Sequence, residues 1–275
     1  MKQLLGLFFG FLLAFSLFLW GPTTPAKAQE EIFSFEKAFQ DYLYVYNQYL
    51  QSHNQYEAAK NSYYTYKTLA SKADAMQKTL TMLQVRDDVV RTYLTTIRLR
   101  LADSTGISTY DQSLLYIKLD TEVGWYIQHR DEVTSAGTLK DLLKTSKKAE
   151  TRFRDSEILA YEALIVILSG KVEAARNLIE QELDQIELKI NEIRLKGDKE
   201  ITSVERWLLE AENKIDRSRE KQEQATITIQ KLKPKFQKKR GVFNEARTSI
   251  HESLIYLKEA NDYLKELIAE VKSAD

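Results

Sequence analysis

The chain contains no cysteine, and its 275 residues include only three prolines and nine glycines. The absence of cysteine excludes disulfides, thiol redox chemistry and a lipid anchor attached through cysteine. Glycine and proline are the residues that most often end a helix, so their scarcity after residue 28 favours long helices. No segment alternates polar and apolar residues over the length of a strand, and we therefore expect no sheet.

An excess of charge of one sign is also missing, because 40 basic residues balance 40 acidic residues. A neutral chain has no general attraction for nucleic acid or anionic surfaces, so any such attraction must be local. The sequence lacks a nucleophile elbow, a P-loop, a dinucleotide-binding fingerprint and the Glu-x-x-His pairs of helical metalloenzymes. We expect a non-enzymatic protein with no cofactor and no metal.

The first 28 residues have the pattern of a secretory signal peptide. Lys2 precedes an apolar run over residues 4–20, and the small-x-small sequence Ala26-Lys27-Ala28 follows. We expect cleavage after Ala28 and a secreted, periplasmic or cell-envelope location for the mature chain, whose net charge would be −2. The alternative is an uncleaved membrane anchor formed by the apolar run, which is slightly short for a comfortable bilayer span.

A seven-residue repeat begins directly after this segment, and its first part is aromatic. Its members are Phe35, Tyr42, Tyr49, Tyr56, Tyr63 and Ala70. Side chains at this spacing form one stripe along a helix, and a stripe of rings must pack against another helix. We predict a single helix over residues 29–102, with a kink or a change of partner near residues 69–76, where the repeat becomes aliphatic.

Two later helix starts are marked by capping-box spacing, Ser108-x-x-Asp111 and Thr138-x-x-Asp141. We predict a pause in the second of these helices at residues 152–156.

We divide the mature chain after this predicted pause into an N-terminal helical region, residues 29–156, and a C-terminal antiparallel three-helix unit, residues 157–275. The first reversal in this unit is predicted at Lys196-Gly197-Asp198 and the next near Pro234. The expected fold class is all-α, an elongated antiparallel helical bundle or coiled coil.

Eight of the 15 tyrosines lie between residues 42 and 66. Packing within the bundle explains most of them, since rings bury a large area and their hydroxyl groups can reach its rim. Tyr44, Tyr64 and Tyr66 lie off the main stripe, and the alternative for these three is an aromatic contact surface for a glycan or a partner chain.

Candidate chemical groups are sparse elsewhere. Glu122, Trp125 and His129 share a helix face, but one imidazole and one carboxylate are too few ligands for a metal site. Asp87, at an inner helix position, is expected to pair with Arg91 one turn later.

The clearest local excess of charge is a cluster of six cations around Pro234: Lys231, Lys233, Lys235, Lys238, Lys239 and Arg240. Such a cluster can complement the dipole of the preceding helix and keep a turn solvated. It can also bind an anionic surface, either phospholipid or wall polymer. Phe236 is the only aromatic residue among them, which disfavours single-stranded nucleic acid as a partner.

Three stretches carry a resemblance to known sequences: Tyr64-Thr-Tyr-Lys-Thr-Leu69, Leu114-Leu-Tyr-Ile-Lys-Leu-Asp120 and Glu205-Arg-Trp-Leu-Leu-Glu-Ala-Glu-Asn213. In these the chain resembles uncharacterised exported coiled-coil and helical-bundle proteins of small-genome candidate-phylum bacteria. The resemblance covers most of the mature chain and implies no activity.

We expect an exported structural or interaction protein, a non-catalytic scaffold at the cell envelope. The alternative is a holdase-type chaperone or a sequestering bundle for envelope proteins. The expected partners are other proteins or further copies of the chain bound through the heptad stripes, and anionic lipid or wall polymer; nucleic acid is not expected.

Overall fold

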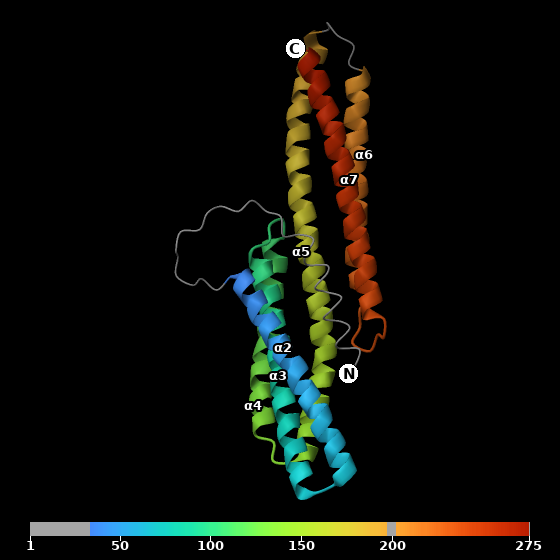
Figure 1. The fold of residues 1–275 in the computed structure, drawn as a ribbon. Coiled ribbons are helices and arrows are strands. Elements are labelled where there is room, and N and C mark those ends of the chain that lie inside the picture. Colours follow the sequence, from blue (N-terminus) through green and yellow to red (C-terminus); the bar gives the residue numbers. More distant parts are fainter. Residues whose placement is uncertain (1–33, 197–201, 275) are drawn as a thin grey trace. The chain divides into compact units, whose positions relative to one another are not determined.

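The computed structural model describes residues 34–196 and 202–274, and within these ranges the chain is helical and has no strand. The predicted all-α fold class is therefore confirmed. The described helices are α2 (Phe35–Tyr66), α3 (Leu69–Ala102), α4 (Thr109–Thr134), α5 (Leu139–Lys196), α6 (Thr202–Ile229) and α7 (Lys239–Ala274) (Figure 1). Elongation stays a prediction, which small-angle X-ray scattering would test.

Two sequence predictions fall outside the described residues. They are the signal peptide with its cleavage site, and the reversal at Gly197 and Asp198. In the part of the chain that is described, no helix has an apolar run long enough to cross a membrane.

The predicted single helix over residues 29–102 is wrong, because the chain reverses at Lys67 and Thr68. Lys67 has a φ of 51°, a left-handed conformation that ends α2. Thr68 then caps α3: its Oγ1 accepts a bond from the Ser71 amide at 3.1 Å, and its own amide donates to Ser71 Oγ at 3.1 Å. The change of stripe near residues 69–76 therefore marks a hairpin and not a kink.

The aromatic stripe of α2 packs against α3 in this hairpin. Tyr42 lies 5.3 Å from Tyr93 between ring centroids, and Thr96 Oγ1 donates to the Ala38 carbonyl at 3.1 Å. The first half of the stripe is buried as predicted, whereas Leu69 beside the turn is 84% exposed. The α2–α3 turn projects beyond the end of α4 (Figure 1), which leaves this tip with fewer neighbours.

Helices α3, α4 and α5 form the rest of the N-terminal bundle. Helix α4 runs antiparallel to α3, since Arg98 pairs with Asp120 at 2.5 Å and Gln84 bonds Thr134 at 2.8 Å. The capping residues Ser108 and Thr138 are confirmed, as each hydroxyl accepts a bond from the backbone amide three residues later. These caps fix where the two helices begin.

Helix α5 is continuous through the predicted pause at residues 152–156. Its 58 residues span about 87 Å, so one helix belongs to both halves of the bundle and the boundary placed after residue 156 lies inside it. The polar residues that suggested a pause are bonded to α4: Arg152 and Ser156 both donate to Glu122. Polar side chains with partners in the next helix do not interrupt a helix.

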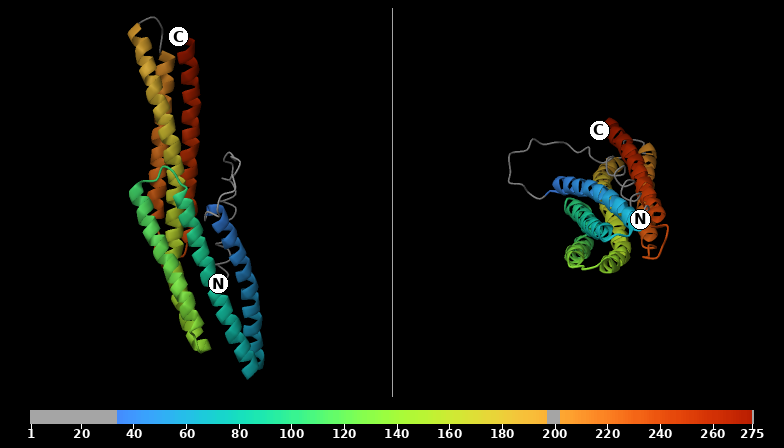
Figure 2. Two further views of the ribbon diagram at one scale, coloured as in Figure 1. Left: turned by 90° about the vertical axis from the view of Figure 1, so that its left-hand side faces the viewer. Right: turned by 60° about the horizontal axis from the view of Figure 1, so that its bottom comes forward.

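The C-terminal half of α5 packs with α6 and α7 (Figure 2). Helix α6 is antiparallel to α5, as the ion pair between Arg194 and Glu205 at 2.6 Å indicates. Helix α7 returns antiparallel to α6 and parallel to α5, where Phe243 stacks on Tyr161 with 4.6 Å between ring centroids. Three helices therefore pack together in this half, as the heptads predicted.

Two glycines allow the loop between α3 and α4 to contact α5 backbone to backbone. Gly106 has a φ of 72°, and a methyl group there would lie 2.0 Å from the Gly170 carbonyl oxygen. A methyl group at Gly170 would lie 2.6 Å from the Thr105 carbonyl oxygen. Only residues without a Cβ fit this crossing.

Candidate functional site

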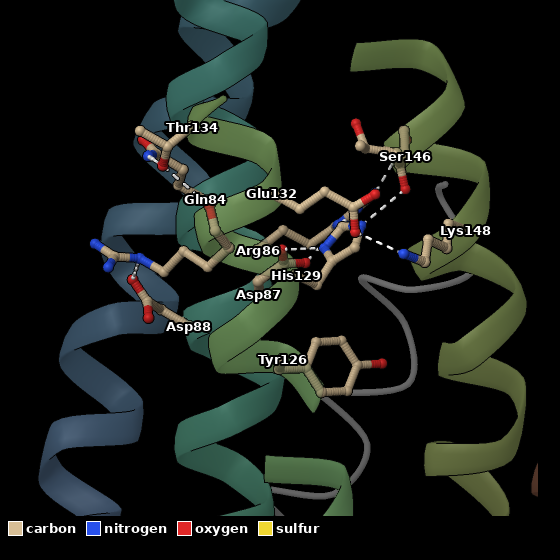
Figure 3. Close-up of polar contacts among 12 residues, drawn as sticks. Gln84, Arg86, Asp87, Asp88, Tyr126, His129, Glu132, Thr134, Ser146 and Lys148 are labelled. Carbon is tan, nitrogen blue, oxygen red and sulfur yellow. Dashed lines mark hydrogen bonds and ion pairs between the residues drawn. The ribbon is translucent and has the colours of Figure 1, made fainter. Parts of the chain in front are cut away.

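A polar contact in the buried core joins Asp87 on α3 to His129 on α4 (Figure 3). His129 Nδ1 lies 2.6 Å from Asp87 Oδ2, and His129 Nε2 lies 3.0 Å from the carbonyl oxygen of Thr145 on α5. Trp125 stacks on the imidazole with 4.7 Å between ring centroids. Asp87 and His129 are 1% and 2% exposed. One imidazole therefore joins three helices in the buried core.

Arg86 is a further charged side chain beside this contact and pairs with Asp87. Its Nη2 lies 3.7 Å from Asp87 Oδ1, and its Nη1 donates to Ser146 Oγ at 3.2 Å. The predicted pairing of Asp87 with Arg91 is wrong, because Arg91 pairs with Asp88 at 3.3 Å. Asp87 points into the core, where α4 supplies its partner.

This arrangement can hold helices together but leaves no free ligand atom on the imidazole. A backbone carbonyl can only accept, so His129 Nε2 donates to Thr145, and Nδ1 is occupied by the carboxylate. Neither nitrogen is available to a substrate or a metal. Among the described residues, no three His, Asp or Glu side chains converge in a way that could hold a metal ion.

A second polar cluster surrounds Glu122 one to two turns away on α4. Its carboxylate accepts from Arg152 Nε at 3.0 Å and Nη2 at 2.5 Å, and from Ser156 Oγ at 2.7 Å. The Tyr126 hydroxyl lies 3.2 Å from the same Ser156 oxygen, and burial raises the pKa of Tyr126. Glu122 and His129 share a helix face as predicted, but each binds its own partners. Sequence reasoning missed those partners because they lie on other helices: Arg152, Ser156 and Thr145 on α5, and Asp87 on α3.

The basic cluster spans the turn between α6 and α7 and the first two residues of α7, beside residues 155–162 of α5. One of its six members is corrected: Lys239 is 6% exposed and its Nζ pairs with Glu157 on α5 at 2.8 Å. It is a buried ion-pair partner and not a surface cation. The other five are exposed: Lys231, Lys233, Lys235, Lys238 and Arg240. Helix α6 has no basic residue in its last turn, so these cations follow the helix end and do not lie within it.

A groove of about 390 Å³ separates this turn from α4, with α5 between them. Its apolar lining consists of Ile117, Ile158, Leu159, Leu232 and Pro234, and its polar lining of Lys118, Thr121, Glu122, Asp155 and Glu162. Burial raises the pKa of Glu162, and the charge of Lys118 partly offsets this effect. The groove is therefore bordered by α4 on one side, by the basic turn on the other and by α5 between them.

The three tyrosines predicted to lie off the stripe are exposed: Tyr44 by 65%, Tyr64 by 65% and Tyr66 by 69%. They do not gather into one surface. Tyr44 and Tyr66 are separated by about 33 Å along α2, and the helical rotation places Tyr64 on a different side. The ring of Tyr64 lies beside that of Tyr63, with 6.1 Å between ring centroids, and does not form one cluster with Tyr44 or Tyr66.

No family model, no curated protein and no solved structure matches this chain. The features that bear on its function are therefore the buried pairs, the basic turn and the groove.

Proposed function

We propose that this chain is an exported, non-catalytic helical protein that acts at the cell envelope as a structural or interaction component. The signal-peptide pattern of residues 1–28 supports export. The observation that best supports this proposal is the distribution of the ionisable side chains between the core and the surface. Those in the core pair across helix interfaces, while the cations of the α6–α7 turn are exposed.

This distribution supports a scaffold role over a catalytic one. Catalytic groups need an approach for substrate and a free donor or acceptor atom. Glu122 is bound to Arg152 and Ser156, and Lys239 is bound to Glu157. Groups paired in this way stabilise the bundle and leave its outer surface to make contacts.

Export is tested by expressing the full chain with a C-terminal tag, beside a variant that lacks residues 1–28. The full chain is expected outside the cytoplasm, with a mature N-terminus at Gln29, and the shortened variant inside. Mass spectrometry of the purified protein identifies that N-terminus. Cytoplasmic retention of the full chain would refute the proposal.

The second candidate is a holdase, which is favoured by exposed leucines on the C-terminal half of α5. Leu178, Leu188 and Leu195 are 64%, 66% and 88% exposed. A holdase should suppress the aggregation of an unfolded envelope protein, and Leu188→Ser with Leu195→Ser should weaken that suppression. A scaffold should leave aggregation unchanged at equal concentrations.

A further inference from the structure

We propose that the protein docks on an anionic lipid bilayer through one face, formed by the α6–α7 turn and the outer side of α4. This inference rests on the proposed envelope role and names its partner. The docking face has four exposed lysines and four exposed apolar residues. The lysines are Lys231, Lys233, Lys235 and Lys238, and the apolar residues are Tyr110, Leu114, Ile117 and Phe236.

The apolar part begins as a stripe on α4. Tyr110, Leu114 and Ile117 follow a spacing of four and three residues, which places them on one helix side. They are 76%, 38% and 66% exposed, whereas the buried residues of α4, such as Leu115 and Leu119, lie on the opposite side. Helix α4 is therefore apolar on two sides, only one of which packs in the bundle.

The stripe is continuous with the basic turn. Ile117 lines the same groove as Leu232 and Pro234, so the outer side of α4 and the turn are neighbours. Phe236, two residues beyond Pro234, is 45% exposed. Apolar side chains thus occur on both walls of the groove and beside the lysines.

The charge of this face is positive. None of its four lysines forms an ion pair with another described residue, and Lys118 adds a fifth cation at the groove. The groove also holds three carboxylates, Glu122, Asp155 and Glu162, of which Glu122 is paired with Arg152. They lower the total charge but do not reverse its sign. Lysines beside an anionic bilayer are attracted to its surface within a Debye length of about 8 Å at physiological salt.

The combination of exposed lysines with exposed apolar side chains favours a bilayer over a soluble polyanion as the partner. A wall polymer would use the lysines alone, because it has no apolar phase to receive Ile117 or Phe236. A bilayer uses both parts, since apolar side chains enter its interface while lysines contact the head groups.

The test uses the exported protein with the N-terminus that it has after export from the cell. Its sedimentation is measured with vesicles of phosphatidylglycerol and phosphatidylcholine in equal parts. Vesicles of phosphatidylcholine alone are the lipid control. We expect binding to the anionic vesicles at low salt and release as salt rises. Lys235→Glu with Lys238→Glu should weaken binding about tenfold or more.

A second pair of substitutions tests how much the apolar side chains contribute to vesicle binding. Ile117→Ser with Phe236→Ser should weaken vesicle binding several-fold and leave the circular dichroism spectrum unchanged, since both side chains are exposed. Leu178→Ser with Leu188→Ser removes apolar side chains of α5 that are at least as exposed as Phe236 and should leave binding unchanged.

Soluble polyphosphate separates the two anionic partners. Binding to polyphosphate as tight as to vesicles, with no effect of Ile117→Ser and Phe236→Ser on either, would overturn the lipid proposal. An exported protein that fails to bind anionic vesicles would also overturn it, while leaving the envelope role intact. A protein retained in the cytoplasm would instead refute the proposed function.

Discussion

Asp87 and His129 contact each other across α3 and α4 at 2.6 Å, in a part of the core where both side chains are at most 2% exposed. The adjacent Asp88 has the same side chain but lies at the rim, where it pairs with Arg91 and Arg130. One residue along a helix therefore separates a buried structural contact from a surface ion pair. The two positions form a matched pair for mutation.

Asp87→Ala should lower the free energy of unfolding by about 3–5 kcal/mol, because it leaves His129 without its buried carboxylate partner and Arg86 without its counter-ion. Asp88→Ala, the control, should cost about 1 kcal/mol or less. Urea unfolding followed by circular dichroism measures both. Equal losses would show that the buried contact is not important to stability.

Gly170→Ala should destabilise the bundle by about 1–3 kcal/mol or more, since the added methyl group meets the Thr105 carbonyl at 2.6 Å. Gly124→Ala, within α4, should have the opposite sign and stabilise by about 0.5–1 kcal/mol. Its methyl group would meet nothing within 4 Å, and alanine favours a helix interior over glycine. Thermal unfolding of the two variants compares them, and a stabilised Gly170 variant would contradict the close crossing.

Lys239→Met should cost about 3–5 kcal/mol, because Glu157, whose side chain is 10% exposed, would lose its cation. Lys238→Met, its exposed neighbour, should change stability by no more than about 0.5 kcal/mol. Chemical unfolding distinguishes the two lysines. Similar losses would mean that Lys239 is not buried against α5. Charge reversals aimed at lipid binding should therefore avoid Lys239.

Glu162→Gln should stabilise the protein at neutral pH. Burial raises the pKa of Glu162 in the folded state, so the folded state binds its proton more tightly than the unfolded state. Stability contributed by this group therefore falls as pH rises from the ordinary glutamate pKa through the raised one. The advantage of the glutamine variant should disappear when the pH drops below the ordinary value.

Unfolding midpoints of the Glu162→Gln variant and the parent, measured over a pH series, test the direction of this pH dependence. Glu150→Gln is the control, because the Glu150 side chain is 62% exposed and belongs to an i,i+4 surface pair with Arg154. A Glu162→Gln variant that is less stable than the parent at neutral pH would contradict the expected burial effect.

Sequence reasoning was reliable where the signal is local and periodic. Heptad spacing identified which segments are helical, though not the hairpin between α2 and α3. Ser108 and Thr138 were found as caps because a cap is formed within four residues. The exposed cations of the α6–α7 turn were also visible as a cluster in the chain. The exposed apolar stripe on α4 was not, since exposure of Leu114 and Ile117 depends on which side of the helix packs.

The sequence by itself determined that this protein is all-helical, because helical periodicity and the scarcity of helix breakers depend only on the order of residues. Only the tertiary structure decided the partners: His129 for Asp87, Arg152 for Glu122 and Glu157 for Lys239. Heptad spacing predicts that a helix face is buried but does not select the helix that covers it. The hairpin at Lys67 shows the same limit. A left-handed conformation at a residue other than glycine leaves no clear mark in the sequence, and here the packing of α2 on α3 stabilises it.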